Sequence, residues 1–378
     1  MRANVFTDAA LKRHAGRFVW LSMNTERADA APFLDKFPVE GWPTLFVIDP
    51  GAEKVALKWP GSATVPQLVR LLDDGERAVK GGGQGLEAKL TALDRAFGQG
   101  NNEEAARIGS ELAAAPPDWP GRPRAVELWL SALSSLKQWD TCASAASAEL
   151  DRLARGAPYA DVTGMGLSCA QELPKDAAGR ADRIDKLEKT AEQILEKRDI
   201  AMAGDDYSGL FLTVVGSHEA RGDADGQKAW TQKWARYLEE AAAKASSPEA
   251  RAVYDSHRMT AYGMLKQPEK SLPMLQASEK ALPDDFNPPA RLAAVYRDLG
   301  RYDEALAASE RALARAQGPR RLRILSTKAD ILQKKGDVPS ARKTLDDALA
   351  FAAALPKAQQ YQSVIDSLQK KRAELDLH

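Results

Sequence analysis

The side chains best suited to thiol or metal chemistry are few in this chain. Its two cysteines, Cys142 and Cys169, lie 27 residues apart, and they are too few for a disulfide framework or a zinc site. Both stand in apolar helical patterns, where a small buried hydrophobic side chain is the default interpretation and a reactive thiol is the alternative. No histidine is followed by a second ligand three or four residues later, so we interpret each as a surface or core residue rather than a metal ligand: His14, His218, His257 and His378.

Motifs for catalysis are also missing from the sequence. It contains no HExxH helix and no serine in a GxSxG elbow. The glycine-rich run from Lys80 to Gly85 could suggest a phosphate loop, but no strand pattern precedes it and no Gly-Lys-Ser/Thr follows. We therefore predict no catalytic residues, no metal and no cofactor in this chain, and leave open whether it is an enzyme.

Charge and hydropathy narrow the class of protein. Basic and acidic residues number 53 each, so the formal net charge is zero and the basic excess typical of nucleic-acid or membrane-surface binding is absent. No apolar run approaches the ~18 residues of a membrane span, and the first residues contain no signal-peptide hydrophobic region. As written, the sequence predicts a soluble cytoplasmic protein, or a periplasmic or secreted one if a signal peptide was lost upstream.

Residues 286–350 have the most regular spacing in the chain. Gly300 and Gly336 each precede a small residue by five positions, and an alanine follows seven positions after that. These small residues are Ala305, Ala312, Ala341 and Ala348. The spacing predicts a helix, a tight turn at the glycine, and a second helix whose alanines let the two backbones approach closely.

This pattern resembles the tetratricopeptide repeat, a helical hairpin of about 34 residues. One similar unit precedes it, starting at Ala252 with Ser271 in the place of the packing alanine, and one follows it after an insertion at Gly318 and Pro319. Three consecutive units are about the minimum that buries a continuous core. An ordinary helical bundle is the alternative. In the central unit the residues that match the family's pattern are Ala293, Tyr296, Gly300, Tyr302, Ala305 and Ala312.

The resemblance implies which residues line the inner groove of the repeat array. In the central unit these are Asn287, Ala290, Ala294, Arg297 and Asp298. In the next unit they are Arg323, Ser326, Asp330, Gln333 and Lys334. We expect this mixed polar, weakly cationic wall to bind a peptide or protein partner. The alternative is that it packs against its own chain.

The first eighty residues differ from the rest because they carry strand patterns. Residues 17–23, 44–49 and 55–61 predict strands, and residues 64–75 predict an amphipathic helix. The segment GWPTLFVIDPGAEKV resembles the loop and hairpin of the thioredoxin family, with Trp42, Pro43 and Thr44 in the family's cis-proline loop. The resemblance implies a cis bond before Pro43, whereas composition alone predicts trans, because only about 5–6% of such bonds are cis.

Redox chemistry in the thioredoxin family requires a Cys-X-X-Cys pair at the start of the helix that follows the first strand. This chain has no cysteine before Cys142, and its first residues resemble the segment just after that pair, with Met1, Phe6 and Asp8 matching the pattern CxxCxxM…vFsD. We expect that the sequence begins just past its own active site. Either the start is truncated, which we favour because a missing central strand would leave an unpaired edge, or the domain is a natural remnant without redox activity.

The stretch from residue 80 onward loses its strand patterns. Glycine and alanine at hairpin spacing (Gly100 and Ala105) predict one divergent hairpin, and Gly222 marks the turn of another. In the second helix of the latter we interpret Trp230, Trp234 and Tyr237 as core. The predicted domains are an incomplete thioredoxin-like domain at 1–79, a glycine-rich linker at 80–86, divergent helical repeats at 87–250, and tetratricopeptide repeats with a capping helix at 251–378.

The sequence therefore predicts an α+β fold: a partial thioredoxin-like α/β domain followed by a large all-α solenoid of tetratricopeptide-like repeats. The favoured function is a non-catalytic scaffold that binds a peptide or protein partner, without nucleic acid, membrane or small-molecule cofactor. The alternative is a thiol–disulfide oxidoreductase or isomerase whose cysteines lie upstream of Met1. In that case Trp42 and Pro43 would border the active site and the repeats would dock the substrate.

Overall fold

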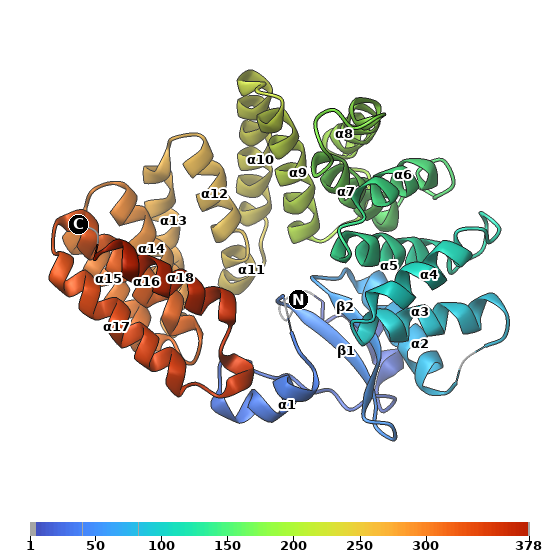
Figure 1. Cartoon of the computed structure of the whole chain (residues 1–378), viewed down its shortest axis with the longest axis horizontal. Coiled ribbons are helices and arrows are strands. Elements are labelled where there is room, and N and C mark those ends of the chain that lie inside the picture. Colours follow the sequence, from blue (N-terminus) through green and yellow to red (C-terminus); the bar gives the residue numbers. More distant parts are fainter. Residues whose placement is uncertain (1–4, 40, 82, 377–378) are drawn as a thin grey trace. The chain divides into compact units, whose positions relative to one another are not determined.

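The computed structural model describes residues 5–39, 41–81 and 83–376. Met1, Gly82 and His378, which take part in the predictions above, lie outside the described residues. The chain is mostly helical, with a two-stranded sheet near its N-terminus (Figure 1). Its residues pack into two compact units: unit 1 is made of residues 1–18 and 41–234, and unit 2 of residues 19–40 and 235–378. The domain boundaries predicted from the sequence stay predictions.

Unit 1 contains the sheet and the helices that follow it. A short 3₁₀ helix (Ala9–His14) precedes β1 (Thr44–Asp49) and β2 (Lys54–Pro60). The helices are α2 (Val65–Val79), α3 (Leu86–Gly98), α4 (Asn102–Leu112), α5 (Arg122–Ser135), α6 (Trp139–Glu149), α7 (Ala157–Gln171), α8 (Arg180–Lys197), α9 (Gly204–Ala220) and the first part of α10 (Ala224–Ala243).

Unit 2 contains one short N-terminal helix and the C-terminal helices. Three short elements follow α10 among the described residues: α11 (Pro248–Ala252) and the 3₁₀ helices η3 (Pro268–Lys270) and η4 (Lys357–Gln359). Among the described helices, none is both long and apolar enough to cross a membrane. The helices of unit 2 are α1 (Ala31–Lys36), α12 (Asp255–Met264), α13 (Ser271–Ala281), α14 (Asn287–Asp298), α15 (Tyr302–Arg315), α16 (Arg320–Lys335), α17 (Val338–Ala354) and α18 (Gln362–Glu374).

The β-hairpin confirms two of the three predicted strands and the helix after them. β1 and β2 pair antiparallel, and the Asp49 carboxylate closes the turn by accepting the backbone N–H groups of Gly51 (2.8 Å) and Ala52 (3.2 Å). Helix α2 begins with a capping box between Thr64 and Gln67. It packs on the hairpin with three buried leucines, Leu68, Leu71 and Leu72.

The strand predicted at residues 17–23 is wrong. Residues 19–24 have no regular secondary structure, and the side chains of Val19 and Leu21 are 87% and 75% exposed. A strand requires a neighbour that accepts its ladder hydrogen bonds, and the described strands β1 and β2 pair only with each other. The apolar composition of this segment is therefore not enough to make it a strand, and the described N-terminal region is a hairpin rather than the larger sheet expected of a thioredoxin-like domain.

Six hairpin turns within the described residues share one hydrogen-bonding pattern. In each, a residue with positive φ ends the first helix, and the next N–H donates to the carbonyl five residues back at 2.8–2.9 Å. This closure is the Schellman motif, which glycine adopts without steric cost. The glycines found by spacing in the sequence all occupy such turns, and lysine takes the same conformation in the other two. The positive-φ residues are Gly100, Lys137, Gly222, Lys266, Gly300 and Gly336.

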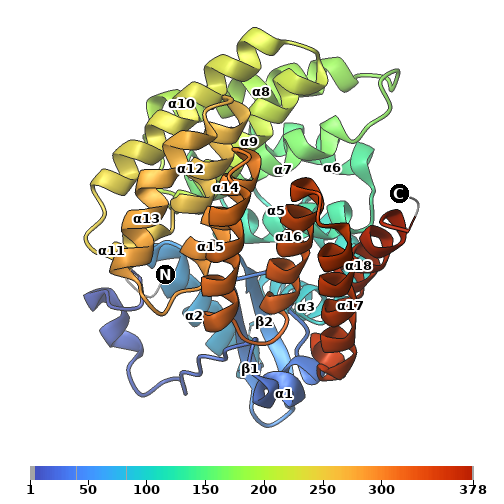
Figure 2. The same ribbon diagram turned by 90° about the vertical axis from the view of Figure 1, so that its left-hand side faces the viewer.

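The structure confirms the hairpins predicted between residues 286 and 350. They are α14 with α15 and α16 with α17, and Figure 2 shows these four helices side by side. The alanines predicted to allow close approach are fully buried. Ala305 shares an apolar cluster with Tyr296, Ala341 and Ala348 share one with Leu332, and Ala312 packs in a third that includes Ala290. The divergent hairpins at Gly100 and Gly222 are also present. Trp230 and Trp234 are buried, as their interpretation as core requires.

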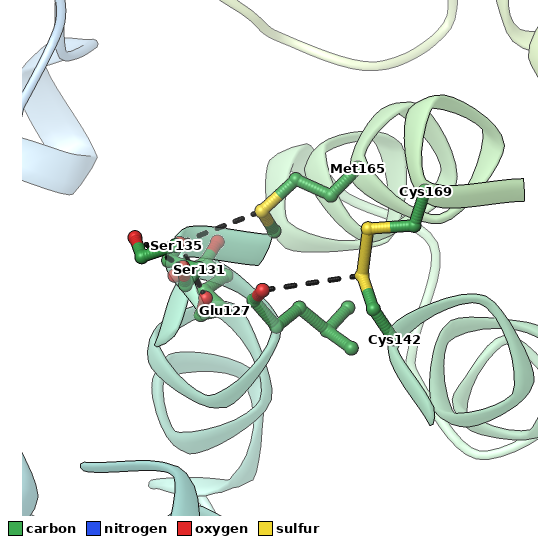
Figure 3. Close-up of a disulfide and its surroundings, with 7 residues drawn as sticks. Glu127, Ser131, Ser135, Cys142, Met165 and Cys169 are labelled. Atoms are coloured by element: carbon green, nitrogen blue, oxygen red, sulfur yellow. Dashed lines mark hydrogen bonds between the residues drawn. A yellow bond between two sulfur atoms is a disulfide. The ribbon is translucent and has the colours of Figure 1, made fainter. Parts of the chain in front are cut away.

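Cys142 on α6 and Cys169 on α7 are both buried, as interpreted from the sequence. They form a disulfide (Figure 3), so the expectation of two unpaired side chains is wrong. Their Cα atoms are 6.0 Å apart, inside the range that a disulfide spans. Close approach of the two helices also depends on Gly166 of α7, because a Cβ at this position would overlap the methyl group of Ala146 on α6. Periodicity in a single sequence does not show which faces of two helices meet, and it could not pair these cysteines.

Two buried arginines tie the elements of unit 1 together. Arg122 of α5 pairs with Glu149 of α6 (Nη2–Oε1 2.7 Å), and its other N–H groups donate to backbone carbonyls just after α4. Arg124 pairs with Asp94 of α3 at 3.0 Å, donates to the Lys58 carbonyl of β2, and lies over the Trp59 ring. Each such bond offsets part of the cost of burying the charge. Arg122 thereby joins α5 to α6 and to the end of α4, and Arg124 fixes the β-hairpin to α3 and α5.

Residues 19–40 pack against the C-terminal helices of unit 2. The Glu26 carboxylate accepts both the backbone N–H (3.1 Å) and Nε (2.9 Å) of Arg320, the first residue of α16, and so occupies the positive end of that helix. The fully buried Gln359 donates to the carbonyls of Thr25 (2.8 Å) and Arg27 (2.7 Å). No local sequence pattern predicts these contacts, because the partners are about three hundred residues apart in the chain.

Candidate functional site

The groove residues predicted on α14 lie along one helix and differ in their exposure. Ala290 and Ala294 are half-buried, and the Asn287 side chain donates to Asp285 just before the helix at 2.7 Å. Arg297 lies near the end of α14, where its Nε donates to the adjacent Asp298 at 2.8 Å. Among these predicted positions, therefore, only the last two, Arg297 and Asp298, carry charged side chains.

On α16, Asp330 is the centre of an ionic network. Arg297 reaches it from α14, with Nη1 and Oδ2 3.6 Å apart. Lys371 reaches it from α18, with Nζ 2.7 Å from both carboxylate oxygens, and also donates to the Ser326 hydroxyl at 3.0 Å. The structure thus brings three helices, α14, α16 and α18, to one carboxylate. Ser326 and Asp330 therefore contact other helices of the same chain, which agrees with the alternative interpretation of these two groove residues.

The remaining groove residues of α16 are exposed: Arg323, Gln333 and Lys334. Neither Arg323 nor Lys334 makes an ion pair with any residue that the structure describes. We call the set formed by Arg297, Arg323, Asp330, Lys334 and Lys371 the α16 wall. Its basic side chains outnumber its acidic ones, and two of them have no carboxylate to neutralise them. The arrangement can attract acidic groups.

The predicted cis-proline loop precedes β1. The bond between Trp42 and Pro43 is cis, the isomer that the resemblance implies. The Pro43 carbonyl accepts the N–H of Gly61 at 2.8 Å, and the Thr44 hydroxyl donates to the Gly41 carbonyl at 2.7 Å. Trp42 is 44% exposed. Within the described residues no cysteine lies near this loop in sequence, and both cysteines of the chain are joined in the disulfide between α6 and α7.

A group of carboxyl side chains on α5, α7 and α9 was missed by the sequence analysis. Burial raises the pKa of Glu127 to about 7 and the pKa of Asp206 to about 6. The pKa of Asp161 lies well above its ordinary value because of burial first and then the charges of Glu127 and Asp206. Each residue stands on the first helix of a successive hairpin, and no motif joins them in the sequence. The sequence could have suggested that these three carboxyl groups meet only if α5, α7 and α9 had been recognised as the first helices of consecutive hairpins.

The cavity beside Glu127 is small. It is enclosed by residues of β2, α2 and α5, including Trp59, Arg70 and Arg124, and its volume is about 30 Å³. Pockets that bind drug-sized ligands measure ~300–1,000 Å³, so this space suits a single water molecule rather than a substrate. Perturbed carboxyl pKa values are frequent in active sites, but here they belong to a packed junction between hairpins.

Comparison with known proteins identifies repeats in the C-terminal part. The tetratricopeptide repeat family model matches residues 287–358, and no curated protein matches the chain. A tetratricopeptide repeat protein from Parabacteroides merdae has 11% sequence identity and a TM-score of 0.46 over 77% of this chain and 100% of that one. The Cut9–Hcn1 hetero-tetramer of the APC/C has 13% sequence identity and a TM-score of 0.33 over 76% of this chain and 50% of that one. Yeast Tom70 has 11% sequence identity and a TM-score of 0.23 over 82% of this chain and 90% of that one. TM-scores below 0.5 are too low to carry an argument about this chain.

Proposed function

We propose, from the premise that this chain is a tetratricopeptide-repeat protein, that it is a non-catalytic scaffold which binds a peptide or protein partner through the α16 wall. Repeat arrays of this kind expose extended surfaces on which partners bind. The finer proposal is that the partner presents an acidic, extended or helical segment to α14, α16 and α18.

The observation that supports this proposal is the pair of exposed cations on α16. Arg323 and Lys334 stand near opposite ends of the helix, and Arg297 and Lys371 both direct their charge to Asp330 between them. An acidic segment laid along α16 would meet Arg323 and Lys334 without displacing an existing ion pair. Because guanidinium and ammonium groups bind carboxylates most strongly when they are not already paired, these two residues would carry most of the charge recognition.

Short fluorescent peptides that differ only in charge can test the proposal. We expect acidic peptides to bind the full chain more tightly than basic ones, and the binding to weaken as salt is raised. The double variant Arg323→Glu with Lys334→Glu should remove the preference. The matched control, Lys280→Glu with Lys343→Glu, makes the same charge change at exposed positions on the second helices α13 and α17 and should retain it. Equal effects of the two double variants would refute a role for the α16 wall.

Thiol–disulfide exchange is the second candidate, and it rests on the resemblance of residues 41–55 together with the observed hairpin and α2. The described sheet has two strands only, and the disulfide of the chain is buried between helices. We therefore expect this chain to show no insulin reduction in the presence of dithiothreitol above the rate without protein. Clear turnover would contradict the scaffold proposal and favour a redox site.

A further inference from the structure

Three side chains on α8 and α9 place metal-binding atoms close together. Glu188 and Glu192 lie one turn apart on α8, and His218 lies near the end of α9. One ligand atom from each lies within 4.8 Å of the other two. His218 Nε2 and Glu192 Oε1 are 3.3 Å apart. With Zn–N and Zn–O bonds of ~2.0–2.2 Å, neighbouring ligands of a tetrahedral zinc ion are separated by about 3.3–3.5 Å. This pair therefore already has the spacing of one edge of such a site.

A second carboxylate fixes the orientation of the histidine. Asp223, the residue after the turn glycine between α9 and α10, has its Oδ2 2.8 Å from His218 Nδ1. Its other oxygen accepts the backbone N–H of Gly226 at 2.9 Å, so the aspartate is held from both sides. An imidazole that donates Nδ1–H to a carboxylate leaves the lone pair of Nε2 for a metal ion, and this carboxylate–histidine arrangement accompanies most metal-binding histidines.

The backbone leaves space for this histidine–aspartate pair. A Cβ at position 226 would overlap both the Asp223 carboxylate and the imidazole of His218. A glycine inside a helix costs ~0.5–1 kcal/mol relative to alanine, and here it allows α10 to start directly against the imidazole. The hydrogen bond between Asp223 and His218 thus depends on the residue type at 226.

Glu188 provides a second, independent observation at this cluster. Its side chain is more than nine-tenths buried, yet Oε2 accepts no hydrogen bond from any residue that the structure describes. Oε1 accepts Nη2 of Arg221 at 2.6 Å. A buried carboxylate oxygen without a partner is costly, and Arg221 is the single cation that the described residues supply to the carboxylates of Glu188, Glu192 and Asp223. The local charge balance is negative, which favours a bound cation.

We propose that Glu188, Glu192 and His218 bind one divalent transition-metal ion, with solvent completing its coordination. Zinc is the expected ion, because imidazole nitrogen combined with carboxylate oxygen suits zinc, whereas calcium and magnesium prefer oxygen ligands alone. The ion would link α8 to α9. The competing account is an ion pair in which a protonated His218 lies between Glu192 and Asp223 and no metal binds.

A zinc titration of the full chain, stripped with a chelator and carrying no histidine tag, distinguishes the two accounts. Competition with a chromophoric zinc chelator should show one ion bound per chain, and zinc should raise the melting temperature, while calcium and magnesium at the same concentration should not. His218→Ala and Glu192→Gln should abolish binding at this stoichiometry. Asp223→Asn should weaken it ~10–100-fold, the usual effect of losing the partner of a metal-binding histidine. The control Glu219→Gln, at the exposed residue next to His218, should leave binding unchanged.

Circular dichroism of each metal-free variant separates lost binding from lost folding. If His218→Ala does not fold, Glu192→Gln alone decides the outcome, because this side chain is more exposed than that of Glu188. No stoichiometric zinc binding by the wild type, or binding that persists in the folded Glu192→Gln variant, would overturn the proposed site and leave the ion-pair account.

Discussion

Replacing Asp161 with asparagine should flatten the pH dependence of stability in unit 1. Asp161 on α7 interacts with Glu127 on α5 and Asp206 on α9, and burial followed by these two charges raises its pKa well above the ordinary value. Carboxyl groups of the unfolded chain ionise near pH 4. The folded chain therefore takes up protons at neutral pH. The stability that these groups contribute is present at low pH and is lost as pH rises through their raised folded pKa values.

The size of the effect follows from proton linkage. Each proton taken up on folding lowers the free energy of unfolding by ~1.4 kcal/mol for every pH unit of increase. Glu127, with a pKa of about 7, stays protonated in the folded chain between pH 5 and pH 6, and the raised pKa of Asp161 adds to the proton uptake on folding. Asparagine at position 161 cannot ionise, so the variant takes up fewer protons on folding. Its side-chain amide can still donate a hydrogen bond to Glu127. One full proton over two pH units corresponds to ~3 kcal/mol, so between pH 5 and pH 7 the variant should lose up to ~3 kcal/mol less stability than the wild type.

Urea unfolding at a series of pH values from 5 to 8, followed by tryptophan fluorescence, measures this difference. The control Asp176→Asn removes one negative charge from an exposed position in the turn between α7 and α8 and should leave the slope of the wild type. Carbon-13 NMR of the carboxyl groups would report the titration directly. Parallel pH profiles for wild type and Asp161→Asn would refute the reasoning, because they would show that folding takes up no proton at this residue.

Two further predictions concern the junction between α6 and α7. Denatured, non-reduced protein should contain no free thiol, and two free thiols would contradict the pairing. The double variant Cys142→Ala with Cys169→Ala should have a free energy of unfolding ~3–4 kcal/mol lower than the wild type, the loop-closure value for a loop of this length. Gly166→Ala should destabilise by ~1–3 kcal/mol, because the new methyl group overlaps Ala146. The control Gly209→Ala in α9, where a Cβ meets nothing within 4 Å, should instead stabilise the protein by ~0.5–1 kcal/mol. If urea titration shows that both variants change the free energy of unfolding in the same direction, close approach at residue 166 is unimportant.

Local rules predicted the hairpins but not the contacts between distant parts of the chain. Gly300 and Gly336 signal their turns because the conformation that closes the Schellman motif favours glycine, and this preference is readable at a single position. The strand at 17–23 failed for the opposite reason: strand formation depends on a partner elsewhere in the chain. The contact of Glu26 with Arg320 depends in the same way on tertiary packing, which no local period encodes.

The candidate sites show the same division. The resemblance placed Arg297, Asp330 and Lys334 on successive first helices, and the structure links the first two by an ion pair. It could not indicate that Lys371 of α18 reaches the same carboxylate, because capping helices carry no repeat pattern. In the sequence, metal ligands were sought three or four residues apart in one helix. The pairing of His218 with Glu192, which lies on another helix, was therefore missed.

The hairpin pattern extends beyond the segment that the family model matches. Lys137 and Lys266 take the positive-φ position of their turns, and the residue after each donates the same hydrogen bond as in the glycine turns. A left-handed conformation costs a non-glycine residue ~1–2 kcal/mol, a cost that the buried helix pairs on either side can offset. Cys142 stands five residues after the turn residue Lys137, as Ala305 stands five after Gly300, and its disulfide joins this hairpin covalently to the next. The match to the repeat family at residues 287–358 therefore accompanies hairpins of the same closure that begin at α3.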